Sequence, residues 1–218
     1  MEQSNSTELR IVNMGVISNG TTLLDAGALD SGVPTGSMTL IKTLTASSSA
    51  NLTFINGSSG VTLDGTYKEY VFKFFDLHPS ANAYTRFQCT TDGSNFNVTT
   101  TSSTFASYHD EADSFTALEY RPSADQPQGT ALQPLNFADP VGTDNDMCFV
   151  GTLHLYDPSS TTFVKHYIAT CNSYSQQPMT TNTFVGGYFN TTSAITGIRF
   201  QQNTGNMDAG TIKMYGIK

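Results

Sequence analysis

The stretch from Met147 to Cys171, MCFVGTLHLYDPSSTTFVKHYIATC, has the pattern of two long β-strands joined by a turn. On both arms, apolar and aromatic residues recur with a period of two, as in strands that bury at least one face. Between the arms, the sequence DPSS at 157–160 favours a turn, because proline presets φ and Asp and Ser side chains bond the local backbone. We therefore predict a hairpin with a tight turn at the centre of the fold, and neither arm carries a catalytic motif.

Further strands are predicted on both sides of this hairpin. Their ranges are Met38–Thr45, Asn51–Asn56, Tyr67–Leu77, Tyr84–Thr91, Phe96–Thr99, Thr183–Asn190, Ile195–Gln202 and Gly210–Ile217. The alternating Tyr70, Phe72 and Phe74 predict a core face, because such rings dominate core burial. About eight to ten strands with polar turns and almost no helix predict an all-β fold, an antiparallel β-sandwich of jelly-roll type.

Two glycine-containing dipeptides add local predictions. Asp92-Gly93 is typical of a hairpin turn, which predicts that Phe96–Thr99 pairs with the strand before it. Gly186-Gly187 lies inside a predicted strand, where glycine indicates a bulge or a close approach of another part of the chain.

Two regions lack a clear strand pattern. Residues 1–36 carry scattered apolar residues, punctuated by glycine and proline, that the segment cannot bury alone. We expect an irregular N-terminal arm that packs on a neighbouring subunit, with a disordered leader as the other interpretation, and a β-sandwich domain at 37–218. Ser102–Asp139 contains several prolines and is predicted as a long ordered connection of the kind that carries interfaces, with Ser114–Tyr120 forming either one or two helical turns or a strand.

Charged residues make up only 13% of the 218 residues, and the formal net charge is −8. Contact with nucleic acid or with an anionic membrane needs clustered Lys and Arg, so we expect neither partner. No apolar run is long enough to span a bilayer, and the polar start MEQSNSTELR is not a signal peptide. We expect the protein to be synthesised in a cytosol and to act wherever it is assembled with its partners.

Three clusters of side chains could bind a metal or act in catalysis, and each also has a simpler structural interpretation. His109–Asp113, HDEAD, could hold a metal or paired catalytic carboxylates, but it lacks the spacing of a calcium loop, and local Asx capping or a solvated acidic loop is favoured. Asp144-Asn145-Asp146 has no downstream Glu ligand, which favours a turn. His154 and His166 lie on facing arms of the hairpin and would form half a metal site if they paired, but no third ligand is evident.

The remaining motifs predict no chemistry. Cys89, Cys148 and Cys171 lie far apart without CxxC spacing and are expected to act as small hydrophobic residues within strands. No Walker, Rossmann, GxSxG or HExxH motif occurs, so no catalytic, cofactor-binding or metal site is predicted. The Asn-x-Ser/Thr sequons reflect an Asn- and Thr-rich composition, and they occur at Asn5, Asn19, Asn51, Asn56, Asn97 and Asn190.

Several segments resemble virion proteins of marine tailed bacteriophages. These segments are YKEYVFKFFDLHPS (67–80), FASYHDEADS (105–114), GTLHLYDPSSTTFVKHY (151–167), GGYFNTTSAITGIRF (186–200) and GNMDAGTIKMYGIK (205–218). The resemblance covers the chain from about Met38 to its C-terminus, and proteins of this group end in a similar GTIKMYG strand. They are described as tail-fibre, capsid-associated or simply structural proteins. The resemblance implies a component of the particle surface and defines no catalytic or binding residue.

We therefore expect a non-enzymatic virion structural protein that decorates the capsid as a cement, knob or head-fibre subunit. Its partners would be the major capsid protein or another virion protein, docked through the arm, and further copies of itself, with a trimer as one arrangement that covers strand edges. The alternative is a tail fibre or receptor-binding protein that recognises a host surface glycan or protein. A third interpretation is a glycan depolymerase that uses carboxylates among Asp110, Glu111, Asp113 and Glu119, although the sequence shows no paired-carboxylate geometry.

Overall fold

The computed structural model describes residues 16–18, 21–25, 28–29, 37–137 and 139–218, and most of the predicted N-terminal arm lies outside them. The chain divides into two compact units, Met1–Ser37 and Met38–Lys218. In the first unit, β1 (Val16–Ser18), β2 (Thr21–Asp25) and β3 (Ala28–Leu29) pair in that order as a small antiparallel sheet.

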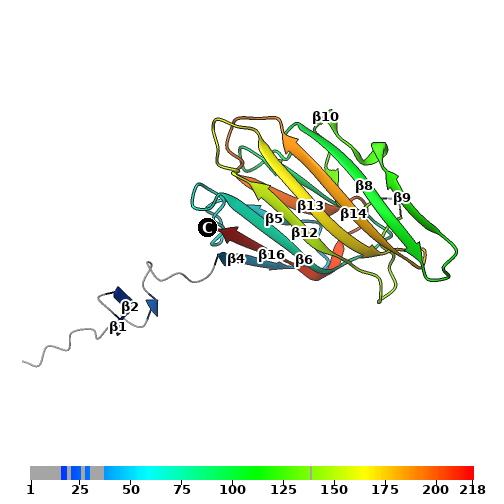
Figure 1. Cartoon of the computed structure of the whole chain (residues 1–218), viewed down its shortest axis with the longest axis horizontal. Coiled ribbons are helices and arrows are strands. Elements are labelled where there is room, and N and C mark those ends of the chain that lie inside the picture. The colour runs from blue at the N-terminus through cyan, green and yellow to red at the C-terminus, as the bar shows by residue number, and fades with distance from the viewer. Residues whose placement is uncertain (1–15, 19–20, 26–27, 30–36, 138) are drawn as a thin grey trace, which may run out of the picture. The chain divides into compact units, whose positions relative to one another are not determined.

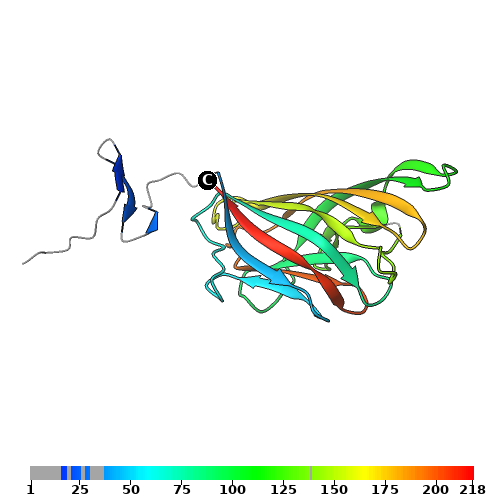
Figure 2. The same cartoon turned by 90° about the horizontal axis from the view of Figure 1, so that it is seen from below.

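The second unit, Met38–Lys218, is an antiparallel β-sandwich, whose two layers are seen edge-on in Figure 2. Its strands are β4 (Met38–Thr45), β5 (Leu52–Ile55), β6 (Glu69–Pro79), β7 (Thr85–Thr90), β8 (Thr100–Asp110), β9 (Thr116–Tyr120), β10 (Pro127–Gly129), β11 (Gln133–Pro134), β12 (Phe149–Tyr156), β13 (Lys165–Tyr174), β14 (Met179–Phe189), β15 (Gly197–Gln202) and β16 (Met207–Ile217). A short 3₁₀ helix, η1, spans Pro122–Ala124.

The strand order identifies the sandwich as a jelly roll with additions. One sheet has nine strands in the order β10-β8-β14-β13-β12-β6-β16-β4, with β9 paired to β8, and the other has four strands in the order β11-β7-β15-β5. The neighbours β4-β16-β6-β12 and β5-β15-β7-β11 are the two halves of a jelly roll, which confirms the predicted fold class. The large sheet then continues through β13, β14, β8, β9 and β10, which we call the extension (Figure 1).

The core lies between the two sheets and is rich in aromatic rings. Phe72 and Phe74 on β6 are at most 2% exposed, as their alternation predicts. The ring of Phe200 on β15 lies 5.4 Å from the ring of Phe72 and 5.2 Å from that of Phe74. On the neighbouring strands, Phe87 of β7 meets Tyr167 of β13 edge-on at 5.1 Å. Such contacts are worth about 0.5–1.5 kcal/mol each beyond the burial of area.

A bulge in β6 changes which side chains face this core. The registers with β12 and β16 both shift next to Phe75 and Asp76, and Asp76 has φ of +49°. Because the bulge adds one residue, the alternation reverses, so Phe75 is exposed whereas Leu77 is fully buried.

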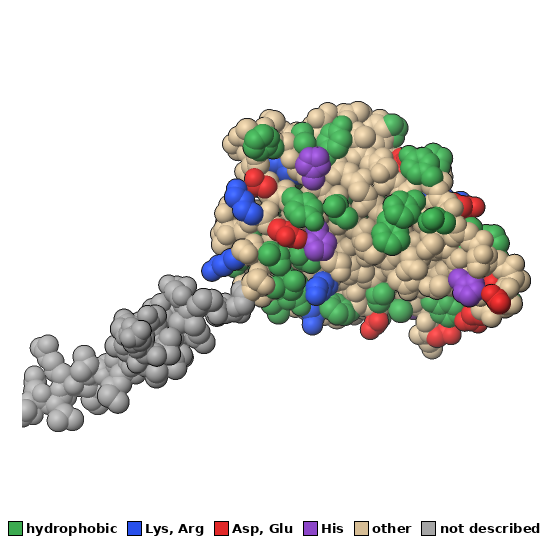
Figure 3. Space-filling model, in the orientation of Figure 1, with side chains coloured by type: hydrophobic (Ala, Val, Ile, Leu, Met, Phe, Trp, Pro, Cys, Tyr) green, Lys and Arg blue, Asp and Glu red, His purple; other side chains and the backbone are tan. Residues whose placement is uncertain are grey.

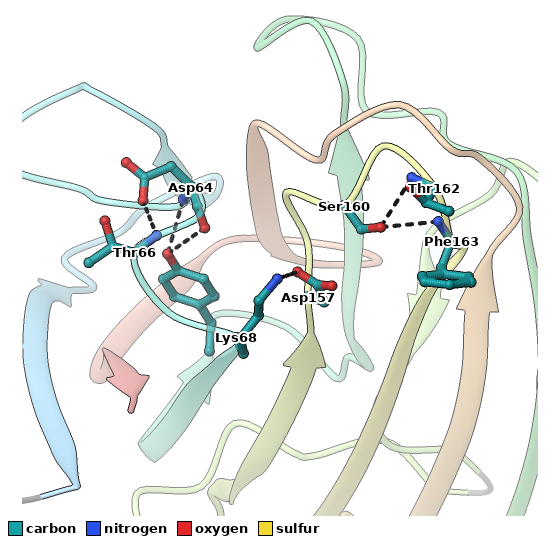
Figure 4. Close-up of polar contacts among 8 residues, drawn as sticks. Asp64, Thr66, Lys68, Asp157, Ser160, Thr162 and Phe163 are labelled. Carbon is teal, nitrogen blue, oxygen red and sulfur yellow. Dashed lines mark hydrogen bonds and ion pairs between the residues drawn. The ribbon is translucent and has the colours of Figure 1, made fainter.

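The predicted hairpin is present as β12 and β13, which pair along almost the whole length of β12. Its connection is longer than the predicted tight turn, because strand pairing stops at Tyr156 and resumes at Lys165. Figure 4 shows what orders this loop: Lys68 Nζ lies 3.0 Å from Asp157 Oδ1, and Ser160 Oγ accepts hydrogen bonds from two following backbone N–H groups. The loop leaves Phe163 69% exposed.

The predicted hairpin at Asp92-Gly93 is wrong, although the local turn forms. The Asp92 carboxylate accepts hydrogen bonds at 2.8 Å from the backbone N–H groups of Ser94 and Asn95, and Gly93 has φ of +79°. The residues that follow do not return alongside β7. The chain instead crosses to the large sheet and enters β8 at Thr100, which pairs with β14.

The predicted long connection at Ser102–Asp139 is also wrong, because it contains most of β8 together with β10 and β11. Within it, Ser114–Tyr120 contains the strand β9, one of the alternatives left open. The reason is visible in the sequence of β8, TTSSTFASYHD. Its buried positions include Thr100, Thr104 and Ala106, whereas Phe105 is exposed, so hydrophobicity does not follow burial along this strand.

Gly186 and Gly187 in β14 are adjacent glycines that differ in how closely other parts of the chain approach them. A Cβ atom on Gly187 would lie 2.5 Å from Tyr167 Oη and 2.6 Å from the Thr101 carbonyl oxygen, which confirms the predicted close approach. A Cβ atom on Gly186 would meet nothing within 4 Å, and neither ladder of β14 shifts register there.

We therefore expect Gly187→Ala to lower the free energy of unfolding by about 2–3 kcal/mol, because the added methyl group overpacks the core. Gly186→Ala should be neutral or stabilise by up to about 1 kcal/mol, because alanine loses less backbone entropy on folding. Urea denaturation of both variants measures the difference. Equal effects at the two positions would contradict this account of the packing.

Candidate functional site

The predicted acidic cluster His109–Asp113 lies at the end of β8, where the chain turns into β9. Asp110 Oδ1 accepts hydrogen bonds from the backbone N–H groups of Ser114 at 2.8 Å and Phe115 at 2.9 Å. Hydrogen bonds from Ser114 and Phe115 hold the pKa of Asp110 below its usual range. His109 Nε2 lies 3.1 Å from Asp113 Oδ1. This geometry is local capping of a turn, in which the Asp110 carboxylate serves the backbone.

Of the four carboxylates considered for glycan hydrolysis, Asp110, Asp113 and Glu119 have local partners. Asp110 caps the turn, and Glu119 on β9 forms an ion pair of 2.6 Å with Arg121. Hollows of about 400 and 450 Å³ adjoin the turn, and both include Asp110 and Glu111 in their lining. In the part of the chain that the structure describes, no group of three or more His, Cys, Asp or Glu side chains has an arrangement that could hold a metal ion.

His154 and His166 do not face one another across the hairpin. The register pairs His154 with Ile168 and, on the next ladder, His166 with Tyr188. His154 Nδ1 lies 2.5 Å from Glu69 Oε1, while the ring of His166 lies 5.9 Å from that of Tyr188. The two imidazoles therefore belong to different local contacts.

A third histidine, His78, joins three segments, and sequence reasoning did not identify it. Its Nδ1 lies 2.8 Å from Asp208 Oδ1, and its Nε2 lies 3.1 Å from the carbonyl oxygen of Asp144. Burial opposes protonation, but the hydrogen bonds to Asp208 and Asp144 outweigh it and raise the pKa of His78. Asp144-Asn145-Asp146 is a turn that leads toward β12, and His78 ties it to β6 and β16.

The cysteines show no sign of reactivity. Cys89 and Cys171 are buried and Cys148 is half-buried, and all three are free thiols. Burial raises the pKa of each thiol, which disfavours the thiolate that acts as a nucleophile.

The outer face of the large sheet is the most distinctive surface of the sandwich. On its four strands β12, β13, β14 and β8, the residues that point away from the core include no Lys, Arg, Asp or Glu. We call these residues the uncharged face: Val150, Thr152, His154, Tyr156, His166, Ile168, Thr170, Asn172, Tyr174, Thr180, Asn182, Phe184, Gly186, Tyr188, Thr101, Ser103, Phe105, Ser107 and His109. Figure 3 shows this face as a largely tan and green surface, with acidic and basic side chains mostly toward its margins.

Large apolar groups line a hollow on the uncharged face. The rings of Phe105 and Phe184 stack with centroids 4.8 Å apart and planes 11° apart, and Phe105 remains 45% exposed. Beside them, Gly186 lacks a side chain next to Ile168, and the resulting hollow has a volume of about 270 Å³. Sequence reasoning missed this surface because Phe105 lies in a segment that was predicted as a connection. A phenylalanine inside a Ser- and Thr-rich alternation was the available signal.

No protein-family model, curated protein or solved structure matches the chain. No helix among the described residues is long and apolar enough to cross a membrane. Function must therefore be inferred from the chain's own residues and their geometry.

The His78 contacts predict a pH-dependent contribution to stability. Because the pKa of His78 is raised in the folded state, the stabilisation is complete below the unfolded-state pKa of about 6.5 and is lost as pH rises through the folded-state pKa. The wild-type protein and an Asp208→Asn variant should therefore differ more in free energy of unfolding at pH 5.5 than at pH 8.5. Denaturant titrations at both pH values provide the measurement, and a difference that is constant or grows with pH would show the assignment to be wrong.

Proposed function

We propose that this protein is a non-enzymatic structural protein of a bacteriophage virion that decorates the capsid surface. The observation that carries the proposal is the division of the chain into an N-terminal unit, Met1–Ser37, and a jelly-roll unit, Met38–Lys218. Jelly rolls are one of the architectures from which viral capsid domains are built, and a fold alone does not define a function. The resemblance of the strand segments to phage virion proteins supports the same proposal.

The chemistry of the sandwich supports a protein that acts through its surface. Several ionisable residues that suggested catalysis or metal binding are engaged locally: Asp110 caps a turn, Glu119 pairs with Arg121, and His154 pairs with Glu69. A catalytic site needs such groups to converge on one substrate position. Because these groups contact separate local partners, the geometry supports a structural role on the virion surface. The protein would reach that surface after synthesis in the host cytoplasm.

The N-terminal arm, residues 1–36, is proposed to dock the subunit on the major capsid protein or another virion protein. An arm that is held by a neighbour adds contact area without enlarging the globular core, although ordering it has an entropic cost. The jelly-roll unit would then face outward, and contacts between copies would cover exposed strand edges.

Deletion of residues 1–36 tests whether the arm docks the subunit while the jelly-roll unit folds without it. We expect the remaining chain to fold and stay soluble, because its core comes from β4 to β16. It should no longer enter particles when it replaces the full chain. The measurements are the far-ultraviolet spectrum and cooperative unfolding of the shortened protein, and its amount per particle by quantitative gel.

Particle incorporation at full occupancy without the arm would overturn the docking role. Binding of the isolated protein to host cells or surface glycans, with the protein absent from tail-less heads, would instead favour the tail-fibre or receptor-binding alternative. Loss of polysaccharide cleavage on neutralising Asp110, Glu111, Asp113 and Glu119 together would favour a depolymerase.

A further inference from the structure

The uncharged face is the surface on which two copies of this acidic protein repel each other least. The chain carries a formal net charge of −8, so two subunits in solution repel at most approaches. The outward residues of β12, β13, β14 and β8 add no formal charge from Lys, Arg, Asp or Glu to that repulsion. Three of these strands, β13, β14 and β8, belong to the extension, which lies beyond the jelly-roll strands of the large sheet.

A protruding side chain and a hollow lie next to each other at the centre of this face. Ile168 on β13 is 53% exposed, which is unusual for an isoleucine in the middle of a sheet. Directly opposite it on β14 is Gly186, and the hollow above Gly186 is walled by Ile168, Phe105 and Phe184.

No local feature of the fold requires a glycine at position 186. A Cβ atom at Gly186 would meet nothing within 4 Å, and Gly186 is not among the residues with positive φ. Glycine within a strand costs roughly 0.5–1 kcal/mol relative to alanine. The empty position is therefore explained better by something that enters the hollow than by the fold of the single subunit.

We propose that the uncharged face binds a second copy of the same chain, with the two large sheets packed face to face about a two-fold axis. The axis would run along the strands between β13 and β14. Because Ile168 and Gly186 are paired neighbours, this rotation places Ile168 of each subunit over Gly186 of its partner. The same operation sets Thr170 against Phe184 and His166 against Tyr188, which are the adjacent pairs of that ladder. A two-fold interface requires such self-complementarity.

The size of the face is adequate for such a contact. Four strands about 4.8 Å apart, with about ten residues each at about 3.3 Å per residue, cover a flat area of roughly 600 Å². Side chains that stand above this plane increase the accessible area toward the roughly 800 Å² that each partner contributes to a stable complex. Face-to-face sheets pack about 10 Å apart, which matches the reach of isoleucine and phenylalanine side chains.

Sedimentation of the full chain over about 1–100 µM tests this interface, because an association of this size has a dissociation constant in or below that range. The wild-type protein should show a reversible dimer of the 23.5 kDa subunit. Ile168→Asp should raise the dissociation constant more than about tenfold, because it buries an unpaired charge. Gly186→Phe should have a similar effect by filling the hollow, while the thermal midpoint stays the same or rises.

Phe163→Asp is the matched control, because Phe163 is an exposed apolar residue on the loop between β12 and β13 and lies outside the uncharged face. It should leave the dissociation constant unchanged. A wild-type protein that is monomeric throughout the range would overturn the proposal, and so would a dimer that tolerates both Ile168→Asp and Gly186→Phe. A monomer whose attachment to particles is lost in Ile168→Asp would assign the face to a different virion protein and would equally overturn it.

Discussion

The contact on which the rest of the structure depends is the packing of Phe200, from the small sheet, against Phe72 and Phe74, from the large sheet. Aromatic rings provide much of the apolar area that two facing sheets can bury, and here they fix the alternation of β6 and β15 toward a common core. Phe87, Tyr167 and Phe189 continue the same layer through β13 to β14, the first two strands of the extension. The jelly roll and its extension are therefore joined by one aromatic layer.

Beyond this aromatic layer the extension is held differently, because its inner face is covered by polar contacts from the segment between β9 and β12. Gln133 accepts a hydrogen bond from Ser102 and donates one to the Ala124 carbonyl, and Arg121 Nε donates to Tyr108 Oη. The inward positions of these strands are rich in threonine and serine, which explains why the core there is smaller. The outward positions of β13, β14 and β8 combine neutral polar residues with the apolar Ile168, Phe105 and Phe184, and they carry no formal charge from Lys, Arg, Asp or Glu.

Most jelly-roll strands were predicted from the sequence, as were β13 and β14 of the extension, whereas β8, β10 and β11 were not. Strand β4 has the predicted bounds Met38–Thr45, although Met38 and Leu40 on it are exposed. The alternating hairpin around Leu153 forms because burial and hydrophobicity coincide there. They diverge on β13, where Lys165 is fully buried with its Nζ 3.0 Å from the Thr191 carbonyl, while Ile168 is exposed. The His78 contacts were equally invisible, because Asp208 lies far away in the chain. Local patterns predict turns and faces, but partner strands and long-range ion pairs depend on tertiary contacts.

The proposed role as a particle component rests on the extended faces of the jelly-roll unit, on the separate N-terminal unit, and on the local engagement of Asp110 and Glu119. Copy number per particle tests this central claim most directly, since capsid decoration requires many equivalent positions and a tail offers few. Quantitative mass spectrometry of purified particles, with the major capsid protein as internal standard, gives that number. A capsid decoration subunit should be present in hundreds of copies and should remain on heads that lack tails. A few tens of copies or fewer, or absence from purified particles, would contradict it.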